Sequence, residues 1–240
     1  MSVLENIQHV QSEILAACQR VQRDPHSLTL IAVSKNQPDQ LIYEALEAGL
    51  SNFGENRPEI APDRLNKFSE YNHIVWHMIG HVQSRKAALI PGYFQMCHSI
   101  DRFKIARKLD DEVARKQASL DVLLEINISG EASKQGFFAH EWQTRLQIQN
   151  NLLTELNPLF ELQHINICGL MTMAPYTNDQ DQIRPVFAGL RELRDWLQIR
   201  LDRSLPHLSM GMSNDYPIAI EEGATLIRVG TAIFDENRTY

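Results

Sequence analysis

The chain has 240 residues, of which 43% are hydrophobic and 22% charged, as expected for a soluble globular protein and not for a disordered or fibrous one. Its formal net charge of −7 argues against a dominant electrostatic grip on nucleic acid or on an anionic membrane. No stretch approaches the run of about 18 apolar residues that a membrane helix needs, and the first residues lack the apolar core of a signal peptide. We therefore expect a cytoplasmic protein. Three cysteines that stand far apart, without a C-x-x-C pair, support neither a disulfide framework nor a thiolate zinc site, and we expect small core residues at Cys18, Cys97 and Cys168.

The amino-terminal segment predicts an amphipathic helix. Apolar residues recur at three- and four-residue spacing from Val3 to Ile14, and the pattern ends before Pro25. After it, short apolar runs rich in branched residues alternate with helical patterns. These runs predict eight strands, at 28–34, 52–55, 74–79, 94–98, 122–127, 165–171, 207–210 and 226–230.

Helical patterns lie between the predicted strands, near 39–49, 101–118, 141–156, 182–202 and 215–222. The clearest is 182–202, in which we place Pro185 in the first turn. Strands that alternate with helices imply a parallel sheet, and eight such units at this length imply one α/β domain over 1–240, a closed (β/α)8 TIM barrel preceded by an extra helix. A doubly wound open sheet is the alternative. It usually has a glycine-rich turn after the first strand, whereas this strand ends in Val33-Ser34-Lys35-Asn36.

The carboxyl ends of barrel strands carry function, and Lys35 follows the first strand. Strand alternation places it on one face with Ile31 and Val33. Desolvation there would disfavour the ammonium, so that a neutral amine could attack a carbonyl and form a Schiff base. The alternative is a surface lysine that extends into water from the strand end.

Arg228 in the eighth strand shares a face with Leu226 and Gly230, so we expect its guanidinium to point inward. A buried guanidinium needs an acceptor, either on a ligand or in an ion pair with Glu125 or Glu55 from other strand ends.

The turns after strands seven and eight have the features of a phosphate site. Gly230-Thr231 and Ser209-Met210-Gly211-Met212-Ser213 supply backbone N–H groups and hydroxyls where such barrels bind phosphate. Helix capping would explain Ser213 or Thr231 alone, but explains both together less well. A lysine, an arginine and a phosphate cradle together suit a ligand with an aldehyde, a hydrogen-bond acceptor and a phosphate. Pyridoxal phosphate carries all three.

Six ordered motifs over nearly the whole chain resemble the pyridoxal phosphate homeostasis protein family of the YggS/PROSC type. They are Ala32-Val33-Ser34-Lys35; Phe53-Gly54-Glu55-Asn56-Arg57; Trp76-His77-Met78-Ile79-Gly80 with Gln83 and Lys86; Asn127-Ile128-Ser129 with Glu131, Lys134 and Gly136; Gly169-Leu170-Met171-Thr172-Met173; and Ser209 to Asp215 with Arg228-Val229-Gly230-Thr231-Ala232-Ile233-Phe234.

The resemblance implies a monomeric barrel similar to the amino-terminal domain of alanine racemase, with pyridoxal phosphate held as a Schiff base on Lys35. It further implies a set of cofactor neighbours around that lysine. By motif position these are Asn56 and Met171 beside the cofactor, Arg228 facing the pyridine nitrogen, Ser213, Gly230 and Thr231 at the phosphate, and Ser209 and Met210 nearby.

Lys134 matches a family lysine implicated in cofactor transfer, with an exposed loop lysine as the alternative. The chain departs from the family pattern at Pro58, which cannot donate a backbone hydrogen bond, and at Asp235, where a glycine is usual.

Arginine beside the pyridine nitrogen disfavours its protonated form and so weakens carbanion chemistry. We also expect the chain to stop at the barrel, without the second domain from which racemases take an acid–base tyrosine. We therefore predict a non-catalytic protein that stores, buffers or delivers pyridoxal phosphate, with apoenzymes as candidate partners.

Two other functions remain open: a pyridoxal phosphate-dependent racemase or lyase whose second base is Tyr216 or His77, and an aldolase in which Lys35 reacts with a sugar phosphate. Zinc at His77 and His81 is disfavoured, because a strand and not a helix is predicted there.

Overall fold

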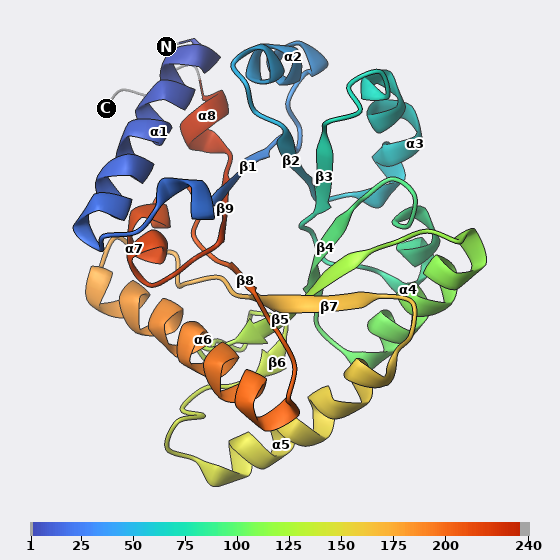
Figure 1. The fold of residues 1–240 in the computed structure, drawn as a ribbon, viewed down its shortest axis with the longest axis vertical. Helices are drawn as coiled ribbons and strands as arrows, with labels where there is room; N and C mark the ends of the chain where they lie inside the picture. Colours follow the sequence, from blue (N-terminus) through green and yellow to red (C-terminus); the bar gives the residue numbers. More distant parts are fainter. Residues whose placement is uncertain (1, 236–240) are drawn as a thin grey trace.

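The computed structural model describes residues 2–235, and a closed barrel of eight parallel strands forms its centre (Figure 1). β1 pairs with β2 on one side and β9 on the other, and pairing of β4 with β5 joins the ends of the sheet into a ring. A further strand, β6, pairs with the last two residues of β5. Within the described residues the strands are β1 Thr29–Val33, β2 Asn52–Glu55, β3 Val75–Met78, β4 Met96–Ile100, β5 Asp121–Asn127, β6 Phe137–Phe138, β7 Asn166–Met171, β8 His207–Ser209 and β9 Leu226–Val229.

Helices surround the barrel, so the predicted (β/α)8 architecture is confirmed (Figure 1). None of the helices within 2–235 is long and apolar enough to cross a membrane. The α-helices are α1 Val3–Arg20, α2 Asp39–Glu47, α3 Ala61–Arg64, α4 Phe103–Lys116, α5 Leu146–Leu156, α6 Gln180–Leu201, α7 Tyr216–Glu221 and α8 Thr231–Phe234; short 3-10 helices are η1 Pro25–Ser27, η2 Pro58–Ile60, η3 Leu65–Phe68, η4 Ser84–Leu89 and η5 Asn157–Glu161.

The extra helix α1 covers the side of the barrel where the shell is thin, because α8 has only four residues (Figure 1). Its first turn is closed by a capping box in which Ser2 and Glu5 exchange side-chain-to-backbone hydrogen bonds. Its apolar stripe is buried, and the buried amide of Asn6 donates to the carbonyl of Ile233 in α8 (3.0 Å). The amphipathic pattern thus becomes a helix that completes the outer shell.

Two details of the helical prediction are wrong. Residues 141–144 form turns, and α5 begins only at Leu146. α6 begins at Gln180, so Pro185 lies in its second turn instead of its first. Pro185 has no N–H to donate to the carbonyl of Asp181, four residues earlier. Because Asp181 is exposed, water can donate to that carbonyl instead.

Two apolar layers stabilise the barrel. A large outer core fills the space between strands and helices, and a small inner cluster fills the middle of the barrel. As expected, the three cysteines are buried, and burial raises the pKa of Cys97 to about 11 and that of Cys168 to about 12. The inner cluster consists of Ile31, Met96, Leu123, Cys168, Met171 and Leu226.

Candidate functional site

The residues that the sequence singled out converge at one end of the barrel. Because all barrel strands are parallel, their carboxyl ends form one rim. A surface hollow of about 440 Å³ lies at the opposite end, where it is lined by residues that precede β7 and β8, such as Phe160 and Arg203. We identify the rim by the chemistry of its side chains.

Lys35 lies in the turn that follows β1, and its side chain is exposed. The expectation of a buried, desolvated ammonium is wrong on this point. The strand that precedes it, β1, lies between β2 and β9 in the barrel. A Cβ at Gly230 would lie 3.3 Å from Cβ of Val33, so the backbone after β9 packs directly against the end of β1. Lys35 thus follows, by two residues, a position that packs against the predicted phosphate turn, and its side chain is open to solvent.

Arg228 points into the barrel and is only 6% exposed. Its guanidinium donates to Ser209 Oγ and to the carbonyl of Thr172 (3.1 Å). Burial lowers its pKa to about 10, opposed by the carboxylates of Asp215 and Glu125. It therefore stays a cation at neutral pH.

Neither acidic residue considered as an ion-pair partner of Arg228 forms that pair. Glu55 accepts a hydrogen bond from Ser34 Oγ (2.7 Å) and lies 3.5 Å from Arg64 instead. Glu125 acts on Arg228 only by electrostatic attraction, without a hydrogen bond. The hydrogen bonds of Arg228 go to the hydroxyl of Ser209 and the carbonyl of Thr172.

Glu125 is a buried carboxyl whose own importance the sequence analysis missed. It is 5% exposed, and pairing of Ile100 with Leu124 places Asp101, the residue after β4, beside it. Burial, then the Asp101 carboxylate, raises the pKa of Glu125 to about 7, although Arg228 acts in the opposite direction. Strand alternation with the inner-cluster residue Leu123 would have placed Glu125 inside.

The turns after β8 and β9 are joined by hydrogen bonds. Ser213 Oγ accepts from the backbone N–H groups of Gly230 and Ala232, both at 3.2 Å. Ser213 therefore performs the capping role that was considered as the alternative, across two loops and not within one. Its oxygen marks a point on which two N–H donors converge, and exposed Thr231 adds a hydroxyl at the start of α8.

The turn after β8 depends on a glycine. Gly211 has φ +93°, and a Cβ there would lie 2.6 Å from Cβ of Ala219. Asp215 Oδ1 then accepts from the N–H of Met212 (2.5 Å), which closes the turn.

The two methionines of the site differ. Met171 ends β7, and its side chain belongs to the inner cluster. The side chain of Met210 packs in the outer core, so only its main chain is available to the rim.

Asn56 is half-buried after β2, and its backbone touches the loop after β3 so closely that a Cβ at Gly80 would lie 2.3 Å from its carbonyl oxygen. Pro58 is the first residue of η2, where a backbone N–H has no helical partner, so this departure from the family pattern costs no hydrogen bond. At the other departure, the carbonyl of Asp235 accepts from Asn6 (3.2 Å), and the rest of that tail, 236–240, lies outside the described residues.

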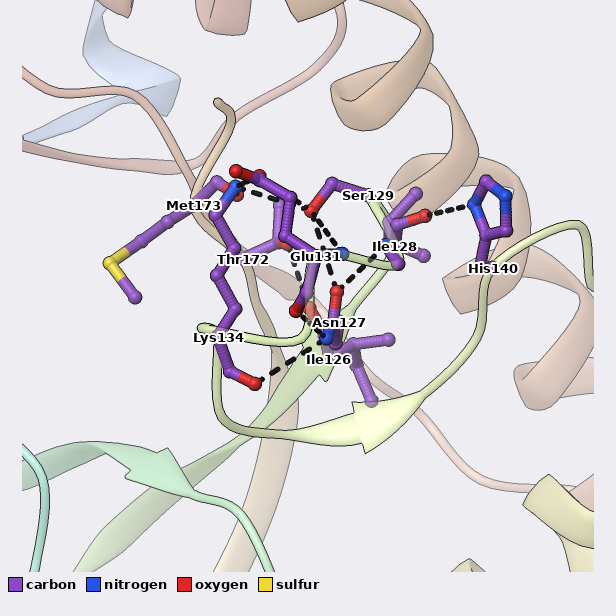
Figure 2. Close-up of polar contacts among 10 residues, drawn as sticks. Ile126, Asn127, Ile128, Ser129, Glu131, Lys134, His140, Thr172 and Met173 are labelled. Carbon is purple, nitrogen blue, oxygen red and sulfur yellow. Dashed lines mark hydrogen bonds and ion pairs between the residues drawn. The ribbon is translucent and has the colours of Figure 1, made fainter. Parts of the chain in front are cut away.

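Lys134 connects the loops after β5 and β7 (Figure 2). Its Nζ forms an ion pair with Glu131 and donates to Ser129 Oγ (3.2 Å) and to the carbonyl of Met173 (3.0 Å). The alternative of an exposed loop lysine is therefore wrong. Lys134 is half-buried and holds the segment that follows Met171.

Two buried histidines, His77 and His98, lie beneath the rim, and the sequence analysis considered only the first of them. His77 is hydrogen-bonded in the barrel interior, to His98 (3.0 Å) and to Asn52 (3.0 Å). Burial lowers the pKa of His77 to about 3 and that of His98 well below its usual value. His81 points elsewhere, with its Nδ1 3.2 Å from a carboxylate oxygen of Asp101.

The chain is similar to known proteins over nearly its whole length. The profile of the family described as "Alanine racemase, N-terminal domain" matches residues 11–237. The pyridoxal phosphate homeostasis protein of Aquifex aeolicus (strain VF5) is 36% identical over 241 residues, which cover 99% of this chain and 100% of that protein. Among solved structures, PipY of Synechococcus elongatus PCC7942 with pyridoxal phosphate bound is 33% identical, with a TM-score of 0.82 over 97% of this chain and 100% of its own.

An alanine racemase of Clostridium difficile 630 shares only the fold, at 11% identity and a TM-score of 0.68 over 95% of this chain and 60% of its own. The relatives above 30% identity carry more weight, because the match spans both partners from end to end. This chain belongs to the pyridoxal phosphate homeostasis protein family (YggS/PROSC type), whose barrel is that of the alanine racemase amino-terminal domain.

Proposed function

We propose that this protein is a cytoplasmic pyridoxal phosphate holder that binds the cofactor as a Schiff base on Lys35 and stores, buffers or delivers it. The observation that carries this function is the packing of the Gly230 turn against Val33, two residues before Lys35, in a chain 33% identical to PipY, which was solved with pyridoxal phosphate bound. The names of the curated relatives point to the same role.

The donor set of the rim fits the cofactor. An amine at Lys35 suits the aldehyde, and the hydroxyls of Ser213 and Thr231 with the N–H of Gly230 suit a phosphate. Arg228 offers N–H donors to a pyridine nitrogen, and Met171 with Asn56 lines the intervening space. This fit supports Lys35, Asn56, Met171, Ser209, Ser213, Arg228, Gly230 and Thr231 as the cofactor site, with Met210 contributing through its main chain.

The charge of Arg228 supports a non-catalytic role. Bound pyridoxal phosphate supplies an electron sink that is strongest when its ring nitrogen is protonated. A guanidinium has donors only, and with a pKa of about 10 it keeps its charge at neutral pH. A second cation beside it is penalised, so Arg228 opposes the protonated ring nitrogen.

The exposure of Lys35 supports reversible loading. Water and free amines can reach a side chain that is exposed at the rim, and both can displace an aldehyde from a Schiff base. We propose Lys134 as a second lysine that takes part in transfer to apoenzymes. Its Nζ is engaged in the ion pair with Glu131, so that pair must open before the amine can react.

A racemase or lyase is the weaker candidate, because neither proposed second base is available at the rim. Tyr216 is buried in α7 and its hydroxyl donates to Glu13 of α1, on the outside of the barrel. His77 is buried among hydrogen bonds below the rim. A Schiff-base aldolase that works without pyridoxal phosphate is also the weaker candidate, because it does not account for the similarity to PipY, which was solved with pyridoxal phosphate bound.

Borohydride trapping tests the assignment of Lys35. Wild-type protein incubated with pyridoxal phosphate and reduced should gain the mass of one cofactor and lose its visible absorbance, and Lys35→Ala should gain none. Lys134→Ala is the matched control and should still be labelled at Lys35. Cofactor mass on Lys35→Ala at the wild-type level would contradict the assignment. Chiral analysis of L-amino acids incubated with the loaded protein should show no turnover.

A further inference from the structure

A chain of hydrogen bonds crosses the barrel interior from β2 to β9. His77 Nε2 lies 3.0 Å from Asn52 Oδ1, and His77 Nδ1 lies 3.0 Å from His98 Nε2. His98 Nδ1 lies 2.8 Å from Ser209 Oγ, which accepts from Arg228. Five strands therefore contribute one side chain each to a continuous path, and all but Asn52 are buried.

The chemistry of the two ends determines where each proton lies. Asn52 Oδ1 can only accept, so His77 Nε2 must carry the hydrogen. The orientation of this amide is supported by its Nδ2, which donates to Ser51 Oγ (3.2 Å). At the other end, a guanidinium can only donate, so Ser209 Oγ must accept from Arg228.

The middle of the path then follows. Burial keeps both imidazoles neutral, and a neutral imidazole with hydrogen on Nε2 presents a lone pair on Nδ1. His77 Nδ1 accepts from His98 Nε2–H, and His98 Nδ1 accepts from the hydroxyl of Ser209. Each group donates to the next, from Arg228 to Asn52, and no link has two donors facing each other.

We propose that Asn52, His77 and His98 are positioning residues that hold Ser209 Oγ as the acceptor of Arg228 and thereby fix the guanidinium in the barrel. The guanidinium is otherwise held by the carbonyl of Thr172, and two fixed acceptors define its plane where one would let it turn. This role rests on the proposed function in one respect, namely that Arg228 faces a bound ring.

This path of hydrogen bonds from Arg228 to Asn52, which we call the relay, is disrupted if His98 gains a second hydrogen. If His98 were protonated on Nδ1, the Ser209 oxygen would have to accept from both His98 and Arg228, and its hydroxyl would lose His98 as an acceptor. The imidazolium would also lie close to a desolvated guanidinium, at a large electrostatic cost. The path of hydrogen bonds from Arg228 to Asn52 therefore requires both histidines to be neutral.

Nuclear magnetic resonance of the protein without added ligand tests the relay directly. Nitrogen-15 spectra at pH 7 should show His77 and His98 as neutral, with hydrogen on Nε2 in both, whereas exposed His73 serves as an ordinary reference. A hydrogen on Nδ1 of His98, or a charged ring at either position, would overturn the proposal.

Variants test the effect on Arg228. His98→Leu removes the link to Ser209, and rotation of the Arg228 guanidinium should become about 5- to 15-fold faster, the equivalent of one lost hydrogen bond. Asn52→Leu is the second variant, remote from Arg228. It removes the acceptor of His77 Nε2–H, so His77 should no longer be restricted to the tautomer with hydrogen on Nε2. Asn52→Asp keeps an acceptor oxygen and should preserve that tautomer. Asn151→Leu on the exposed face of α5 is the matched control. Unchanged Arg228 rotation in folded His98→Leu, as judged by circular dichroism, would refute the positioning role.

Titration with pyridoxal phosphate separates this role from the proposed function. His98→Leu should bind the cofactor about 5- to 15-fold more weakly and still form the reducible adduct on Lys35. If wild-type protein fails to bind pyridoxal phosphate, the proposed function fails, whereas the histidine tautomers and the Arg228 rotation rate still decide the relay.

Discussion

The carboxyl group of Glu125 makes the stability of this protein depend on pH in a predictable way. In the unfolded chain the group ionises at its ordinary pKa of 4.5, whereas burial and Asp101 raise its pKa to about 7 in the folded protein. The folded state therefore holds a proton between these values that the unfolded chain has lost. This contribution to stability is fully present below pH 4.5 and is lost as pH rises through about 7.

The magnitude follows from the same two pKa values. At about 1.4 kcal/mol per pH unit, the interval from 4.5 to about 7 is worth about 3 kcal/mol. Glutamine has nearly the same shape and no charge to bury. At pH 8.5 the free energy of unfolding of Glu125→Gln should therefore exceed that of the wild type by about 2–3 kcal/mol. At pH 5 the two free energies should differ by less than about 1 kcal/mol.

Urea unfolding followed by circular dichroism at pH 5, 7 and 8.5 measures this difference. Other titrating groups change wild type and variant alike, so the difference between the two isolates Glu125. Glu155→Gln on the exposed face of α5 is the control and should stay within about 0.5 kcal/mol. A variant that is equally offset at all three pH values, or less stable at pH 8.5, would refute the reasoning.

Three further predictions concern acid stability, packing and capping. Burial holds the pKa of His77 at about 3, against 6.5 in the unfolded chain, so the contribution of neutral His77 to stability should be fully present above pH 6.5 and be lost as the pH falls toward 3. In the Glu125→Gln variant, the urea midpoint should therefore be lower at pH 4.5 than at pH 6.5. Gly169→Ala should cost more than about 3 kcal/mol, because its Cβ would lie 2.1 Å from a backbone oxygen, whereas Gly49→Ala, strained at φ +89° but in open space, should cost about 1 kcal/mol by the same urea assay. Ser2→Ala should lower the unfolding free energy by about 1 kcal/mol through loss of the capping box, and equal stability would contradict that role.

Much of the fold could be predicted because barrel strands leave a simple local signal. Short branched runs bounded by turns identified all eight strands of the ring, and their alternation with helices implied parallel pairing. The short 3-10 segments, such as η4 between β3 and β4, were missed because they are too brief for a helical period. Parts of the outer shell therefore could not be recognised from periodicity.

The site was predicted unevenly. The inward face of Arg228 followed from strand alternation, and the glycine and serine turns followed from their order along the chain. The exposure of Lys35 did not follow, since the residue lies beyond the last paired position of β1, where alternation no longer governs direction. Likewise, the part-burial of Lys134 depends on the carbonyl of Met173, 39 residues away.

The sequence by itself determined the barrel, the rim on which chemistry could occur and the family, because these depend on periodicity and on motifs that are continuous along the chain. Only the tertiary structure decided how the interior charges are satisfied. Asn52, His98 and Ser209 lie up to 157 residues apart, and each looks ordinary in its own segment. They act together because closure of the ring brings β2, β4 and β8 around one interior, where water is excluded and each buried donor must find an acceptor.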